Sequence, residues 1–91
     1  MTEPAYRVEL APAAQRQLRR LPQGDAAALR GPILALALEP RPRGASKLAT
    51  SGYWRIRVGQ LRVIYAIDAR RRRVVILKVA RRAESTYRRV R

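Results

Sequence analysis

The order of apolar and polar residues predicts an N-terminal strand followed by a helix. Over residues 6–10, Tyr6, Val8 and Leu10 alternate with charged residues, which is typical of a strand with one buried face. From Pro12 onward the apolar residues change to helical spacing. Pro12 suits the first turn of a helix, because an N–H at that position would have no intrahelical partner.

The following segment predicts a second helix, so that the two helices form an antiparallel hairpin. Pro22 is expected to end the first helix, and the Gln-Gly pair after it is expected to turn the chain. Asp25 is a candidate N-cap for a second helix over about residues 25–39. We expect Pro32 to kink this helix, because a proline ring clashes with the carbonyl four residues earlier. The proline-rich residues that follow predict a loop.

From residue 53 onward the period of the apolar residues changes to two, which predicts three successive strands. They cover residues 53–58, 61–67 and 74–80. Only Gly59 and Gln60 separate the first two strands, and a glycine at the first of two loop positions favours a type II′ hairpin. The predicted fold is therefore α+β in the order β-α-α-β-β-β: an N-terminal strand, a helical hairpin packed on one sheet face, and a three-stranded antiparallel meander. Because the chain has no internal repeat and no linker, residues 1–91 are expected to form a single domain.

The same hairpin loop predicts how the residues of its two strands pair. With these two residues in the loop, Arg57 lies directly opposite Arg62, and Arg55 lies nearby on the same outer face. Like charges opposite each other destabilise a sheet, so the cluster of three arginines favours an anionic ligand between them. Apolar neighbours on this face, such as Ile64, favour a covered or binding surface over the alternative of a plain solvated face.

Composition and charge indicate an anionic partner. The chain has no cysteine and no histidine, which excludes disulfides, a histidine general base and the usual zinc sites. The formal net charge is +15; residues 41–91 hold 16 basic side chains against two acidic ones, while residues 1–40 are nearly neutral. Such a one-sided charge implies nucleic acid, a ribosome or an acidic protein as partner. No apolar run approaches a membrane span and no secretion signal opens the chain, so we expect a cytoplasmic protein with no membrane partner.

Short motifs occur in a fixed order along the chain. They are Leu18-x-x-Leu21-Pro22, Glu39-Pro40-Arg41-Pro42, Lys47-Leu48, Trp54-Arg55-Ile56-Arg57-Val58-Gly59, Arg62-Val63-Ile64-Tyr65, and then Arg82 and Tyr87. Together they resemble the RelE/ParE superfamily, the toxins of bacterial type II toxin–antitoxin systems, over about residues 6–89. The resemblance implies the same β-α-α-β-β-β fold that the hydrophobic pattern predicts.

The resemblance implies one of two activities. RelE-like members are ribosome-dependent endoribonucleases that cut mRNA, whereas ParE-like members inhibit DNA gyrase without being enzymes. Basic residues on the open sheet face, with a C-terminal arginine and tyrosine, match the RelE-like members and imply a metal-independent endoribonuclease. The matching catalytic residues are Arg55, Arg57, Arg62, Arg82 and Tyr87. A gyrase inhibitor and an inactive homologue that only binds an antitoxin are the alternatives.

The resemblance also implies the partners. These are a cognate acidic antitoxin protein, the ribosome and mRNA, with DNA gyrase as the alternative partner. Further contacts to RNA or to the ribosome are predicted for Lys47, Tyr53, Arg70, Arg71, Arg72, Arg73 and Arg81.

The residue types permit RNA cleavage without a cofactor or a metal ion. The planar guanidinium group of arginine matches phosphate oxygens, and fixed cations stabilise the charge that develops on a phosphate. Arginine is a poor base because it holds its proton at every accessible pH. The proton of the attacking 2′-hydroxyl must therefore pass to another group, for which Tyr87 and Glu84 are the candidates.

Overall fold

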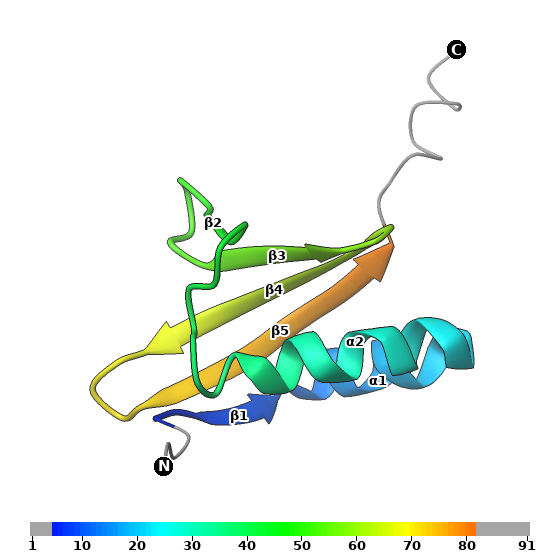
Figure 1. The fold of residues 1–91 in the computed structure, drawn as a ribbon, viewed down its shortest axis with the longest axis horizontal. Coiled ribbons are helices and arrows are strands. Elements are labelled where there is room, and N and C mark those ends of the chain that lie inside the picture. The colour runs from blue at the N-terminus through cyan, green and yellow to red at the C-terminus, as the bar shows by residue number, and fades with distance from the viewer. Residues whose placement is uncertain (1–4, 82–91) are drawn as a thin grey trace.

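The computed structural model describes residues 5–81, which form a five-stranded sheet with two helices on one face (Figure 1). The elements are β1 (Arg7–Leu10), α1 (Pro12–Arg20), α2 (Gln23–Ala35), β2 (Ser46–Lys47), β3 (Trp54–Val58), β4 (Leu61–Asp68) and β5 (Arg73–Arg81). The strand order in the sheet is β1-β5-β4-β3-β2, and every neighbouring pair is antiparallel except β1 and β5. The predicted α+β fold is confirmed.

The hydrophobic core lies between the helices and one face of the sheet. Its buried members are Ala14, Leu29, Ile33, Leu36, Ile56, Leu61, Val63, Tyr65, Val74, Ile76 and Val79. Tyr65 has no exposed surface, and the half-buried Tyr6 and Trp54 pack against the same cluster. The opposite face of the sheet is therefore the outer face, as the alternation of the strands predicts.

The β3–β4 hairpin has the predicted register. Arg57 pairs with Arg62, and Val58 pairs with Leu61 at the turn. Gly59 has a φ of +60°, which a type II′ turn requires at its first central position and which residues with a Cβ rarely adopt. The loop length thus fixes which side chains face one another across the two strands.

The start of α2 differs from the prediction. Residues Gln23 and Gly24 are its first two helical residues, and the chain turns one residue earlier, at Pro22. Leu21 and Pro22 both have extended backbone, with ψ angles of 150° and 147°, and these two residues separate the helices without further turn residues. Asp25 lies in the first turn of the helix and is not its N-cap.

Helix α2 passes through Pro32 without a break. Gly31 precedes the proline and has no Cβ, which relieves the clash that normally disfavours a helical residue at that position. Pro32 also lies near the end of the helix. Because proline has no N–H, the carbonyl of Ala28 lacks its helical partner, but Ala28 is exposed. The helix ends at Ala35, earlier than predicted, and neither described helix is long and apolar enough to cross a membrane.

Three features of the sheet are absent from the prediction. The two-residue strand β2 extends the sheet beyond β3. Strand β1 pairs with β5 only as far as Ile76, and beyond it Gln17 of α1 accepts a 2.7 Å hydrogen bond from the N–H of Val79. Strand β5 contains a β-bulge at Leu77, because Ile64 pairs with Lys78 while the next residue of β4 pairs with Ile76.

Candidate functional site

The outer face of the sheet carries a cluster of basic side chains at one end. Residues that pair across antiparallel strands share a face, so the register defines rows on this surface. The first row contains Arg57, Arg62 and Ala80. The second row contains Ser46, Arg55, Ile64 and Lys78. We call Arg55, Arg57, Arg62 and Lys78 the basic cluster.

The charges of the basic cluster are not neutralised within residues 5–81. Arg57 and Lys78 are exposed, and Arg55 and Arg62 are half-buried. Neighbouring strands lie about 4.8 Å apart, so the stems of the opposed Arg57 and Arg62 run side by side. The ion pairs of the described residues involve only other arginines, namely Arg71, Arg73 and Arg81. The cluster therefore presents four cations that can bind an anion.

Lys78 belongs to the cluster although the sequence analysis did not select it. An ideal alternation along β5 that starts from the buried Val74 and Ile76 would point residue 78 toward the core. The bulge at Leu77 shifts the strand by one residue and places Lys78 on the outer face, opposite Ile64. The only signal in the sequence is a single charge inside an otherwise apolar run, because an unpaired lysine is rarely buried.

The arginines of the β4–β5 turn lie far from the basic cluster. Asp68 at the turn comes six positions after Arg62 in β4, a distance of roughly 20 Å along the strand. Arg73 lies 3.5 Å from the carboxylate of Glu9 and 4.0 Å from that of Asp68, and Arg71 lies 3.6 Å from Asp68. These two predicted contact residues are thus partly neutralised. Their neighbours Arg70 and Arg72 are exposed at the same distant end.

Two other predicted contact residues, Arg81 and Lys47, lie on the helix side of the sheet. Arg81 pairs with the buried Leu61, and its guanidinium donates a hydrogen bond to the carboxylate of Asp25 at the start of α2. Lys47 pairs with Trp54 and so shares its face, the side that carries the helices. Tyr53 is 42% exposed and directly precedes β3, where its carbonyl accepts a hydrogen bond from the N–H of residue 48. The alternation along the strand places Tyr53 on the outer face, two residues from Arg55.

Two of the five predicted catalytic residues, Arg82 and Tyr87, lie outside the described residues, as does Glu84. Arg81 pairs with Leu61, next to Arg62, so β5 ends at the same end of the sheet as the basic cluster (Figure 1).

The buried Tyr65 has a structural role on the core side. Its hydroxyl donates a 2.6 Å hydrogen bond to the carbonyl of Pro40, and burial raises the pKa of Tyr65 to about 12. The neighbouring Arg41 lies with its guanidinium 5.4 Å from the ring centre of Trp54, close enough for a cation–π interaction. These contacts fasten the proline-rich loop after α2 to the edge of the core. Tyr65 keeps its proton at neutral pH and cannot serve as a general base.

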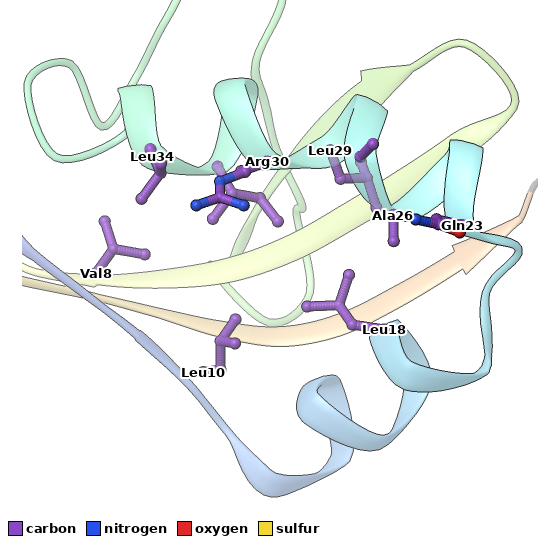
Figure 2. A pocket seen from close by; sticks show the side chains of 10 residues that line it. Val8, Leu10, Leu18, Gln23, Ala26, Leu29, Arg30 and Leu34 are labelled. Carbon is purple, nitrogen blue, oxygen red and sulfur yellow. The ribbon is translucent and has the colours of Figure 1, made fainter.

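A second candidate site is an apolar groove on the helix side, between α2 above and β1 and α1 below (Figure 2). Its volume is about 510 Å³, and its apolar lining includes Val8, Leu10, Leu18, Leu29, Ile33 and Leu34. Leu34 is 58% exposed, and Leu38, one turn further along the chain, is 54% exposed. Arg30 is the charged residue of the lining. The sequence analysis missed this groove because both faces of α2 are apolar.

Comparison with known proteins identifies relatives of this chain. Residues 8–86 match the family model described as the ParE toxin of the type II toxin–antitoxin system parDE. No curated protein sequence matches the chain. Its structure is similar to a chain of the archaeal RelE–RelB complex from Pyrococcus horikoshii OT3, with a TM-score of 0.77 and 29% identity over 88% of this chain and 98% of that one.

Two further solved structures are similar. A chain of the toxin–antitoxin complex RelBE2 from Mycobacterium tuberculosis has a TM-score of 0.77 and 33% identity, and the match covers 86% of this chain and 99% of that one. The isolated RelE toxin of E. coli has a TM-score of 0.76 over 96% of this chain and 100% of that one. At 15% identity, the E. coli protein shows a shared fold alone.

Proposed function

Because this chain belongs to the ParE-toxin family, within the RelE/ParE superfamily of type II toxin–antitoxin systems, we propose that it is a ribosome-dependent endoribonuclease that cuts translated mRNA in the cytoplasm. The observation that carries this proposal is the basic cluster: cations from three neighbouring strands on an uncovered sheet face, without an ion pair among residues 5–81. A single-stranded RNA backbone has the charge and the shape to lie across such a face.

The proposed chemistry is attack by a ribose 2′-oxygen on the neighbouring phosphorus. A bond forms between the 2′-oxygen and phosphorus, the bond to the 5′-oxygen breaks, and a 2′,3′-cyclic phosphate remains. Negative charge grows on the two non-bridging oxygens during this step. Arg57 and Arg62 lie opposite each other, so a phosphate between them receives hydrogen bonds from both guanidinium groups. This stabilisation is the main contribution that we assign to the described residues.

The first proton transfer is assigned to residues beyond β5. Tyr87 or Glu84 accepts the proton of the 2′-hydroxyl. The 5′-oxygen takes a proton from water as it leaves, and Arg82 stabilises the negative charge on it. Neither a metal ion nor a cofactor enters this mechanism. The ribosome supplies alignment of the mRNA, which can be worth several kcal/mol and compensates for a weak base.

Gyrase inhibition is the second candidate function, and the match to the ParE-toxin family model favours it. In that case the basic cluster is a docking surface and RNA is not cut. A toxin homologue that binds its antitoxin and has no activity is the third candidate.

Two reactions run in parallel with the same purified protein distinguish these functions. The first contains end-labelled mRNA on programmed ribosomes, and the second contains gyrase and relaxed plasmid. We expect cleavage of ribosome-bound mRNA, no cleavage of free mRNA, and unchanged supercoiling. Inhibited supercoiling with intact mRNA would establish the gyrase inhibitor, and no effect in either reaction would establish the inactive homologue.

We also infer that the cognate antitoxin binds through the apolar groove of Figure 2. A second copy of this chain is a poor occupant, because two molecules of net charge +15 repel each other. An amphipathic segment of the antitoxin is the better occupant. Its apolar side chains would pack against Leu34 and Leu38, and its acidic side chains would pair with Arg30.

The substitution Leu34→Asp tests this docking site. Leu34 is largely exposed, so the fold should tolerate the change, whereas the affinity for the antitoxin should fall at least tenfold. Ala28→Asp is the matched control, because Ala28 is exposed on the same helix and does not line the groove. Equal antitoxin affinity of both variants, measured by titration calorimetry, would exclude the groove as the docking site.

A further inference from the structure

The outer face continues from the arginine pair into a second row with a different chemical character. On three neighbouring strands this row places Arg55, then Ile64, then Lys78. Ile64 is half-buried, and the half-buried Val75 and Leu77 extend the apolar surface along β5. Arg55 and Lys78 thus lie on either side of an apolar surface formed by Ile64, Val75 and Leu77, which we call the apolar floor.

We propose that Arg55, Ile64 and Lys78 form a second nucleotide subsite, which holds the nucleotide next to the one bound at Arg57 and Arg62. The proposal rests on the proposed function only for its ligand, a single strand of RNA, and not on RNA cleavage. The base lies on the apolar floor, and Lys78 binds the phosphate on the side away from Arg55.

The spacing of the rows supports this subsite. Strands lie about 4.8 Å apart, so the backbones at Arg55 and Lys78 are roughly 10 Å apart with Ile64 between them. This separation leaves room for one flat base between the two side chains. The two rows lie two residues apart along each strand, or about 7 Å, which is a step that successive phosphates of an extended RNA strand can match.

The opposite end of the sheet limits the path of the strand. Glu9 and Asp68 neutralise Arg73 there, and Asp68 also pairs with Arg71. An RNA backbone gains less from Arg71 and Arg73, because these two cations already have carboxylate partners. Among the cations of β5, Arg73 and Arg81 form ion pairs and Lys78 forms none within the described residues. Lys78 is therefore the cation of this strand that remains for an RNA phosphate.

The chain offers a charge-matched control for this test in Arg16 of α1. Arg16 and Lys78 are both exposed, but Arg16 belongs to a helix on the opposite face of the sheet. The loss of either cation changes the net charge equally, so a nonspecific effect of charge is the same for both. Only a contact at Lys78 makes the two variants differ.

The experiment measures binding of a fluorescent single-stranded RNA oligonucleotide by anisotropy over a range of salt concentrations. The oligonucleotide is 2′-O-methylated, so that attack by a 2′-oxygen cannot cut it. We expect Lys78→Ala to weaken binding roughly five- to tenfold. We also expect it to reduce the slope of log affinity against log salt by about 0.7, the value for one lost phosphate contact on a single strand. Arg16→Ala should leave affinity and slope unchanged, and Lys78→Arg should retain both.

Equal slopes for the wild type and Lys78→Ala would overturn the subsite, and so would undetectable RNA binding or equal losses in both alanine variants. These results are independent of the test of nuclease activity. If RNA binding depends on Lys78 but mRNA is not cut on ribosomes, the subsite is supported and the nuclease function is excluded. If mRNA is cut but the salt slopes are equal, the nuclease function is supported and the subsite is excluded.

Discussion

At the scale of single residues, the direct opposition of Arg57 and Arg62 is an arrangement that stability alone does not favour. Like charges on directly paired positions destabilise a sheet by a few tenths of a kcal/mol, up to about 1 kcal/mol. No acidic side chain among residues 5–81 forms an ion pair with either arginine. The pair is therefore best explained by an external anion that binds between the two guanidinium groups.

The first prediction concerns Arg62→Ala. We expect the rate of mRNA cleavage on ribosomes to fall about 10²–10³-fold, the usual effect of removing one fixed donor from a developing charge. The free energy of unfolding should not fall by more than about 0.5 kcal/mol, because the side chain has no ion pair within the described residues and its removal relieves the opposition to Arg57. Arg16→Ala is the control, since Arg16 is exposed on α1, on the opposite face of the sheet. Comparable losses of cleavage rate in both variants would contradict the role of the basic cluster.

The second prediction concerns Tyr65→Phe. Removal of the hydroxyl leaves the buried carbonyl of Pro40 without its partner, which should lower the free energy of unfolding by about 1–2 kcal/mol. The pKa of Tyr65 is raised to about 12 in the folded protein, from about 10 in the unfolded chain. The folded state therefore holds this proton more tightly, so its contribution to stability is complete below pH 10 and is lost as the pH rises toward 12.

Urea unfolding of the wild type and Tyr65→Phe between pH 8 and pH 12 measures this effect. The difference in stability between the two proteins should be constant up to about pH 10 and should then shrink as the pH rises. A difference that stays constant to pH 12 would show that Tyr65 titrates normally and is not held by Pro40.

At the scale of the elements, the sequence predicted best where a local rule determines the geometry. The two-residue loop at Gly59 determines the pairing of β3 with β4, and with it the position of Arg57 opposite Arg62. The start of α2 could not be predicted in this way, because Gln and Gly after Pro22 suit a turn as well as a first helical turn. Lys78 was not placed either, since its bulge arises from the fit between two strands. The single charge inside an apolar run was the one local signal for its exposure.

The third prediction tests the hairpin with two glycine substitutions. Gly59→Ala should lower the free energy of unfolding by about 1–2 kcal/mol, because a Cβ disfavours a φ of +60°. Gly24→Ala should raise it by up to about 1 kcal/mol, because Gly24 is helical and no atom lies within 4 Å of the added Cβ. Both values follow from thermal unfolding monitored by circular dichroism. A stabilising Gly59→Ala would contradict the turn, and a destabilising Gly24→Ala would contradict the helix start.

At the scale of the whole molecule, the fold separates two surfaces that a toxin needs. The basic cluster occupies the outer face of the sheet, and the apolar groove lies on the side of the helices. Residues 41–91 carry a net charge of about +14, and the strands of this half form the outer face. The sequence predicted the anionic partner from this asymmetry. It could not predict the groove, because the groove depends on how α2 lies over β1 and α1.

The fourth prediction follows from the number of cations in the basic cluster. Arg57 and Arg62 share one phosphate, so the four cations make three phosphate contacts. At about 0.7 each, these give a slope near −2.1 for log affinity against log salt on single-stranded RNA. Affinity should then fall roughly 20-fold between 50 and 200 mM salt. Fluorescence anisotropy with the 2′-O-methylated oligonucleotide gives the slope. A slope near zero would show that the cluster does not bind an RNA backbone.

The central claim is that the basic cluster cuts mRNA on the ribosome, and primer extension on cellular transcripts tests it most directly. RNA is collected shortly after induction of the wild-type protein or of Arg62→Ala, each with and without an inhibitor of translation. The account predicts new cuts within translated reading frames that disappear when translation is blocked and are absent for Arg62→Ala. Intact transcripts in cells that the wild-type protein arrests would contradict the account and would make the basic cluster a docking surface.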